Sequence, residues 1–187
     1  MILRNCKIKE RRTKKIFENA NITMGSINCI LNGDDWGEHL TIEEFDKKYL
    51  IYDLHKNRIT PDFVTVLNPN EYFVFGSNLA GRHGKGAAKQ AKNSFGAQLG
   101  IGVGYTGNCY AIPTKDNNIK TLKISNIKKY VERFIQTAEH NLNKIHLVTE
   151  IGCGLAGYSV EEIAPLFNRA KFIKNIHLPK SFWIEIL

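Results

Sequence analysis

Cysteine is scarce in this chain of 187 residues, and its four cysteines lie far apart. They are Cys6, Cys29, Cys109 and Cys153. No two of them form a CxxC pair or a spacing typical of zinc ligands, which argues against a disulfide framework and a structural metal site. We therefore expect reduced cysteines, no bound metal and no cofactor.

Long hydrophobic runs are also missing. No apolar stretch approaches the roughly 20 residues that a membrane-spanning helix needs. The first residues, Met1 to Lys7, lack the apolar core of a secretory signal peptide. The sequence thus predicts a cytoplasmic protein without a membrane partner.

Acidic residues are fewer than basic ones. The chain has 26 Lys and Arg against 18 Asp and Glu, a net charge of +8, which favours anionic partners. Much of the excess is local, since residues 7–15 hold six basic residues and one acidic residue, Glu10. This segment is either a solvated edge or a nucleic-acid contact, and no aromatic-basic motif of an RNA-binding module accompanies it.

The first 68 residues contain few glycines and differ from the rest of the chain. Residues 27–31, 50–54 and 63–67 have the composition of strands. Thr41-Ile42-Glu43-Glu44 is a capping box that predicts a helix to about Tyr49. We therefore predict a small N-terminal α+β region, or added strands, over residues 1–68 and a second domain over residues 69–187.

From Glu71 onward, strand and helix patterns alternate, which favours an α/β sheet with helices on both faces. The strands are predicted at residues 72–75, 109–112, 145–149, 175–178 and 182–186, with Pro113 ending the second. One helix is predicted at residues 86–94, and another starts at an N-cap, Ser125, and buries an apolar stripe. A third follows the capping box at Ser159 and is kinked or delayed by Pro165.

Two glycine-rich loops each connect a strand to a helix. The first spans residues 76–86, and the second spans residues 152–158. Glycine lets backbone N–H groups approach a ligand closely, and the N-terminus of a following helix adds partial positive charge. Two such loops in one domain predict a phosphate or diphosphate held from two sides.

The segment from Glu71 to Leu187 resembles the macrodomain family, in particular a branch of phage and bacterial proteins. The motifs that carry the resemblance are Phe75-Gly76-Ser77-Asn78, Gly81 to Lys89, Tyr110 to Lys115 and Ile151 to Tyr158. The resemblance implies a macrodomain-like three-layer α/β/α fold with a mixed central sheet. Macrodomains bind ADP-ribose, and some hydrolyse ADP-ribosyl linkages, in a cleft at the carboxyl ends of the strands.

The resemblance also implies roles for single residues. Asn78 matches an asparagine that contacts the ribose near its reactive carbon, and residues 81–86 match the loop over the distal ribose and phosphate. Residues 152–158 match the loop that wraps the diphosphate, with Tyr158 flanking the distal ribose. The predicted ligand-binding residues are Gly76, Asn78, Gly81, Gly84, Gly86, Lys115, Gly152, Cys153, Gly154, Leu155, Ala156, Gly157 and Tyr158.

Three residues are candidates for catalysis: His83, Lys85 and Asp116. Many hydrolytic macrodomains carry an acidic residue in the first loop, where this chain has Lys85. His83 is a candidate general acid or base, or a phosphate donor. Lys85 is a phosphate contact, a nucleophile or a solvated lysine. Asp116 is either a base beside Lys115 or part of a loop ion pair.

The second loop contains Cys153, which is either a small packed residue or a thiol whose pKa is lowered by a helix N-terminus. An acidic residue that contacts adenine is not identified. The sequence therefore predicts binding of ADP-ribose or a related NAD-derived nucleotide, with or without hydrolysis of an ADP-ribosyl linkage on a macromolecule. The alternatives are a module that only binds or sequesters such a nucleotide, and a nucleic-acid-associated protein.

Overall fold

The computed structural model describes residues 2–10, 16–23, 27–28, 39–40, 49–51 and 56–186, with side chains from residue 57 to residue 186. The chain forms two compact units, Met1–Asn57 with Leu187, and Arg58–Ile186. The predicted boundary at residues 68 and 69 lies too late. Residues 58–68 belong to the second unit because β6 (Ile59–Thr60) pairs with β11 (Ile176–Pro179) and because Val64 is buried.

The first unit contains short antiparallel pairings. β1 (Ile2–Glu10) lies between β2 (Ile16–Thr23) and β5 (Tyr49–Ile51), and β3 (Ile27–Asn28) pairs with β4 (His39–Leu40). The 3₁₀ turn η2 (Lys56–Arg58) leads into the second unit. The helix predicted from Thr41 lies outside the described residues.

Within residues 56–186, six strands form one mixed sheet in the order β6-β11-β10-β7-β9-β8. The additional strands are β7 (Glu71–Asn78), β8 (Gly104–Thr106), β9 (Cys109–Lys115) and β10 (Ile145–Val148). All neighbouring pairs in this sheet are parallel except β8 with β9, which is antiparallel. The predicted α/β class and the mixed sheet are thus confirmed.

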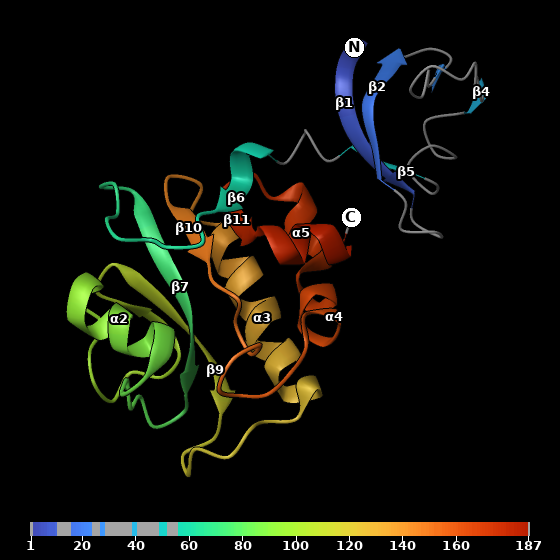
Figure 1. The fold of residues 1–187 in the computed structure, drawn as a ribbon. Helices are drawn as coiled ribbons and strands as arrows, with labels where there is room; N and C mark the ends of the chain where they lie inside the picture. Colours follow the sequence, from blue (N-terminus) through green and yellow to red (C-terminus); the bar gives the residue numbers. More distant parts are fainter. Residues whose placement is uncertain are drawn as a thin grey trace. The chain divides into compact units, whose positions relative to one another are not determined.

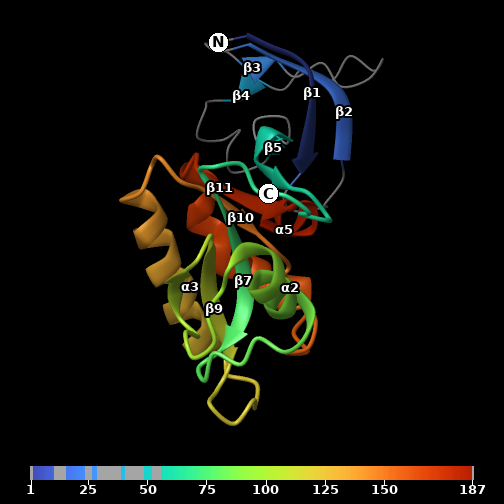
Figure 2. The same cartoon turned by 90° about the vertical axis from the view of Figure 1, so that its left-hand side faces the viewer.

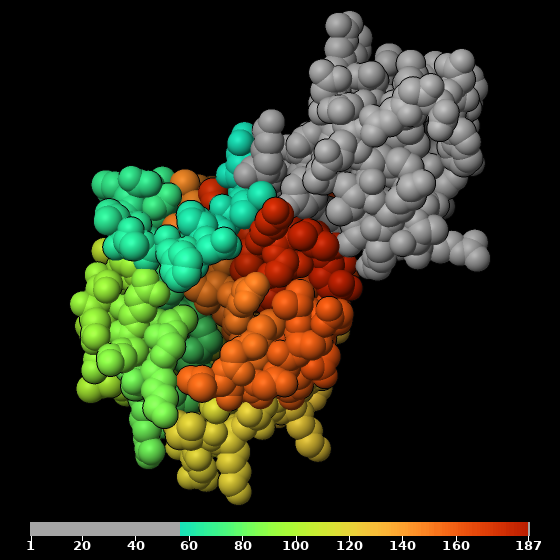
Figure 3. Space-filling model, in the orientation of Figure 1, coloured from blue at the N-terminus to red at the C-terminus, as the bar shows by residue number. Residues whose placement is uncertain are grey.

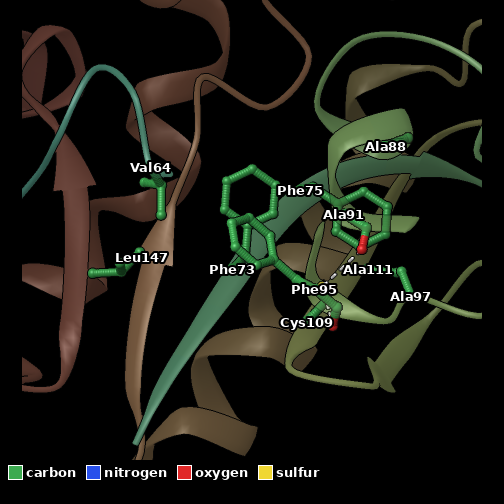
Figure 4. Packing of buried hydrophobic residues seen from close by; sticks show 10 residues of the cluster. All are labelled: Val64, Phe73, Phe75, Ala88, Ala91, Phe95, Ala97, Cys109, Ala111 and Leu147. Atoms are coloured by element: carbon green, nitrogen blue, oxygen red, sulfur yellow. Dashed lines mark hydrogen bonds between the residues drawn. The ribbon is translucent and has the colours of Figure 1, made fainter. Parts of the chain in front are cut away.

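Helices lie on both sides of this sheet, as Figures 1 and 2 show. On one side, α2 (Gly86–Phe95) packs its alanine-rich face against β7. Phe73 and Phe75 of β7 alternate with residues of the opposite face, so both rings point toward this helix. These rings belong to the hydrophobic core between the sheet and α2, which Figure 4 shows. The buried residues of this core are Val64, Phe73, Phe75, Ala88, Ala91, Phe95, Ala97, Cys109, Ala111 and Leu147.

On the other side of the sheet lie α3 (Ile124–Glu139), α4 (Val160–Ile163), the 3₁₀ helix η3 (Ala164–Phe172) and α5 (Lys180–Ile186). The predicted apolar stripe of α3 is buried. Phe134 of α3 contacts Tyr110 of β9 and Phe167 of η3, with ring centroids 5.0 and 6.4 Å apart. Sheet and helices therefore form a three-layer α/β/α arrangement.

Four local predictions are wrong in detail. Residues 63–67 form no strand. β9 continues through Pro113, because β8 pairs only with residues 109–111 and needs no N–H from the proline. The N-cap of α3 is Lys123 rather than Ser125. Residues 182–186 form a helix, in which Phe182, Trp183 and Ile186 are buried at helical spacing.

The effect of Pro165 is as predicted. The α-helix that begins after Ser159 ends at Ile163, and the chain continues as η3 with Pro165 in its first turn. Proline offers no N–H to an interior helical bond, so a change of helix type at this point is expected. The predicted cap is also present, since the Ser159 N–H donates to Glu162 at 2.9 Å.

Candidate functional site

A cleft of about 680 Å³ opens at the carboxyl ends of β7, β9 and β10. The chain leaves β7 toward β9 on one side, whereas it leaves β10 toward β11 on the other. Loops that diverge in this way leave a crevice between neighbouring parallel strands, where α/β proteins bind ligands. In Figure 3 the cleft lies between the green segment that begins α2 and the orange segment that follows β10.

Both glycine loops contribute to the cleft. The predicted residues that line it are Gly76, Asn78, Gly84, Lys85, Gly86, Lys115, Gly152, Cys153, Gly154, Leu155 and Ala156. Predicted residues that do not line it are Gly81, His83, Asp116, Gly157 and Tyr158. Lining residues that were not predicted are Ser77, Arg82, Ala87, Ala88, Thr114, Ile119, Thr149, Glu150 and Ile151.

Asn78 holds the first loop in shape. Its Nδ2 donates to the Arg82 carbonyl, and its Oδ1 accepts from the Arg82 N–H, both at 3.0 Å. Each end of the amide retains capacity for one further bond. Gly81 is structural, since a Cβ there would lie 2.4 Å from the Gly100 carbonyl carbon and its φ is +64°. The glycine-rich segment 100–107 contributes no lining residue to the cleft.

His83 lies beneath the first loop rather than in the cleft. Its side chain is 1% exposed and packs edge-on against Phe75. Nε2 lies 3.0 Å from the Gln98 carbonyl and 3.2 Å from the Ile101 carbonyl, so we assign the ring proton to Nε2. This placement removes His83 from the predicted catalytic set, because its ring does not face the cleft.

The N-terminus of α2 faces the cleft directly. Lys85 is the N-cap in extended conformation, and no side chain among the described residues caps it. Gly86, Ala87 and Ala88, the first three residues of the helix, all line the cleft. The amides of a first helical turn have no partner within the helix and carry partial positive charge, so this end can receive an anion.

The second loop presents an open backbone to the same cleft. A Cβ added at Gly154 would meet no atom within 4 Å, and the same holds for a Cβ at Gly84 opposite. Gly152 has φ +84°, and a Cβ there would lie 2.9 Å from Cδ1 of Ile163. Leu155 lies 3.9 Å from the position that a Cβ on Gly86 would take, so the two loops meet at the rim.

Asp116 and Tyr158 form hydrogen bonds with the backbone of the loops around the cleft. The Asp116 carboxylate accepts from the N–H groups of Asn118 and Lys120 at 2.8 and 2.9 Å, which closes the turn after β9. The Tyr158 hydroxyl donates to the Leu122 carbonyl at 2.6 Å. Neither side chain lines the cleft, so we remove Asp116 from the predicted catalytic set and Tyr158 from the predicted ligand contacts.

Cys153 is a neutral thiol at neutral pH. Burial, together with the nearby carboxylates of Glu150, Glu161 and Glu162, raises the pKa of this thiol to about 11. The thiol lies 3.6 Å from the Ile151 carbonyl. Of the two alternatives for Cys153, this supports the small packed residue over the thiol with a lowered pKa, because burial and the acidic residues around the loop both disfavour the thiolate.

Glu150 is the acidic residue of the cleft, within the part of the chain whose side chains are described. It lies two residues after the end of β10 and is exposed, and the Ser181 hydroxyl donates to its Oε1 at 2.5 Å. Its position shortly after a buried strand is a sequence signal for a site residue. Ile119, by contrast, reaches the cleft from the turn at residues 116–122 and carries no such signal.

A second hollow of about 430 Å³ adjoins the cleft and shares Ala87, Thr149 and Glu150 with it. Asp62 and Phe63, which follow β6, line its far side. The Phe63 ring is 87% exposed. The sequence did not point to these residues, because they lie in the segment that was assigned to the first domain.

No family model, curated protein or solved structure matches this chain. The resemblance to macrodomains therefore stays a prediction. Among the described residues, no group of three or more His, Cys, Asp and Glu side chains is placed to hold a metal ion. None of the helices in the described ranges combines the length and apolar composition needed to cross a bilayer.

Proposed function

We propose that the cleft binds ADP-ribose or a related NAD-derived nucleotide. The observation that carries this proposal is the pairing of an uncapped helix N-terminus with an open glycine loop across one cleft. Helix N-termini and exposed loop amides bind phosphate oxygens through N–H groups. An anion held from both sides in this way fits a diphosphate.

The diphosphate is proposed to lie between α2 and residues 152–156. Gly84 and Gly154 leave room for the phosphates, since even a Cβ at either position would meet no atom within 4 Å. Arg82, Lys85 and Lys115 line the same cleft and supply positive charge. Arginine suits this role because its planar guanidinium can donate two hydrogen bonds to a phosphate.

The two ends of the nucleotide are proposed to lie on either side of the diphosphate. The cleft near Asn78 and Lys115 would hold the distal ribose. The second hollow would hold the base, where Phe63 offers an exposed ring for stacking and Asp62 an acceptor for an amino group. The volumes of both hollows fall within the range typical of small-molecule sites.

The geometry favours binding over the predicted catalytic mechanism. Of the three predicted catalytic residues, Lys85 alone lines the cleft. A hydrolytic version of the proposal would use Lys85 and Glu150, which both face the same space. The alternative nucleic-acid contact at residues 7–15 lies largely outside the described residues and stays a prediction.

The test is a side chain placed in the open space of the second loop. Gly154→Val adds a branched side chain at a position where a Cβ meets no atom within 4 Å and where φ is not positive. We expect thermal stabilisation by ADP-ribose to disappear, while the melting temperature of the free protein changes little. Gln136→Val, on the exposed face of α3, is the matched control and should retain the stabilisation. Equal stabilisation of wild type and Gly154→Val would overturn the assignment of the cleft.

A further inference from the structure

The positive charge of the chain is concentrated in the second unit. Residues 58–186 hold 16 Lys and Arg against 9 Asp and Glu, which gives this unit +7 of the chain's net charge of +8. The basic segment 7–15 is offset by acidic residues elsewhere in the first unit. Residues 7–15 do carry a local charge of +5, but the first unit as a whole contributes only +1 to the net charge.

One stretch of the second unit contains no acidic residue at all. From Tyr72 to Lys115 there is no Asp or Glu, whereas the stretch contains Arg82, Lys85, Lys89, Lys92 and Lys115. It comprises β7 from its second residue, α2, β8 and β9, and it supplies one side of the cleft. Basic residues without acidic neighbours produce an uninterrupted positive potential.

Three of these cations lie together along α2. Lys85, Lys89 and Lys92 are four and three residues apart, so their side chains share one face of the helix. All three are exposed. Among the side chains that the structure describes, no carboxylate lies within 4.0 Å of these three amino groups. We refer to Arg82, Lys85, Lys89 and Lys92 as the basic rim.

The basic rim contains a hollow of its own. A shallow depression of about 280 Å³ is lined by Arg82, Lys92 and Leu99, with His83 at its inner side. Leu99 is 67% exposed. His83 Nδ1 is buried and has no hydrogen-bond partner among the described residues. Arg82 and Gly84 line both this hollow and the main cleft, so the two are contiguous.

We infer that the basic rim binds the phosphodiester backbone of a single-stranded nucleic acid, with one base in the hollow beside Leu99. This inference rests on the proposed function and names its substrate class, a nucleic acid that carries the nucleotide held in the cleft. The strand would leave the distal end of the cleft across Arg82 and pass along α2.

The charge of the basic rim and the shape of its hollow both favour a single-stranded nucleic acid as the ligand. Lysine and arginine neutralise phosphates, and bases contribute by stacking on exposed apolar or planar groups. A single strand presents unstacked bases that can enter a hollow, whereas the bases of a duplex are paired and stacked. An acidic protein segment would satisfy the charge of the rim but would leave the hollow beside Leu99 unused.

The experiment measures binding of a fluorescein-labelled single-stranded oligothymidylate by anisotropy, at salt concentrations from about 50 to about 200 mM. The test variant is Lys89→Gln/Lys92→Gln, since neither lysine lines the main cleft. Lys129→Gln/Lys174→Gln removes the same charge from exposed positions elsewhere and is the control.

We expect the test variant to bind the oligonucleotide about tenfold more weakly at low salt, with its slope of log K against log salt reduced by about 1.4. The control should lose less than about threefold. Equal losses in both variants, or stronger binding of poly-glutamate than of oligonucleotide, would overturn the inference.

A titration of the same proteins with ADP-ribose separates this inference from the proposed function. Both double variants should retain wild-type affinity for ADP-ribose. Oligonucleotide binding that depends on Lys89 and Lys92 in a protein without ADP-ribose affinity would leave the rim assignment standing and refute the proposed function. Normal ADP-ribose affinity in a wild-type protein that binds no oligonucleotide would refute the rim assignment alone.

Discussion

The stability of the second unit should fall in mild acid because of one buried imidazole. His146 lies in β10, fully buried, and its Nε2 accepts from the Tyr105 hydroxyl at 2.8 Å. Burial is the main reason that its pKa is lowered to about 4. Lys144 and His177 add to the lowering, and the hydrogen bond with the Asn175 carbonyl opposes it. The folded state therefore holds this ring neutral where an unfolded chain would protonate it.

The sign and size of this pH effect on stability follow from the pKa of His146 in the folded state and the ordinary histidine pKa in the unfolded chain. Below about pH 6.5 the unfolded state binds a proton that the folded state does not, so the free energy of unfolding falls as the pH falls. The loss continues down to about pH 4, where His146 protonates in the folded state as well. Over this interval the difference amounts to about 3 kcal/mol.

Urea denaturation at about pH 7.5 and about pH 4.5 measures this loss. The comparison variant is Tyr105→Phe/His146→Phe, which replaces the hydrogen-bonded pair with two apolar rings and leaves no polar atom of the pair unsatisfied. Tyr105→Phe alone keeps the imidazole and is the control. We expect the double variant to lose clearly less stability in acid than the control. Part of the loss should remain, because burial and Arg58 also lower the pKa of His177. An equal acid loss in the double variant and the control would refute the assignment to His146.

The remaining predictions concern the loops of the cleft. Gly152→Ala should lower the free energy of unfolding by about 2–3 kcal/mol, because a left-handed backbone and contact with Ile163 both oppose a side chain; a change below about 0.5 kcal/mol in urea denaturation would contradict this. Asn78→Ala should accelerate hydrogen exchange of the Arg82 amide, whose N–H donates to Asn78, and should weaken ADP-ribose binding about tenfold; unchanged exchange would show that the loop is held otherwise. Tyr158→Phe should leave ADP-ribose affinity within about twofold of wild type, since the hydroxyl donates to a carbonyl of the protein itself. A large loss of affinity, measured by calorimetry, would show that Tyr158 contacts the ligand.

Much of the second unit could be predicted from residue patterns. The apolar stripe of α3 has a period that only a helix buries on one face, and Pro165 marks the change from α4 to η3. The run at residues 182–186 failed as a prediction, because a short apolar segment fits a buried strand as well as a helix. In the fold this segment packs as a helix against η3, and the ring centroids of Phe167 and Phe182 lie 5.5 Å apart.

The site was predictable at the level of loops but not of single side chains. Glycine spacing marked both loops, and most of their predicted residues line the cleft. His83 and Asp116 were misplaced because sequence does not show whether a loop side chain turns toward a ligand or toward the protein. Phe63 was missed because residues 58–68 are predicted to belong to the first region, whereas the two-residue strand β6 joins this segment to the sheet beside the cleft.

The most direct test of the proposed function is isothermal titration of the full chain with ADP-ribose, followed by mass analysis of the recovered ligand. We predict saturable heat with one site per chain and recovery of intact ADP-ribose, as expected for a ligand held by both glycine loops. The absence of heat, together with an unchanged melting temperature at saturating ADP-ribose, would contradict the proposal that this cleft binds an NAD-derived nucleotide.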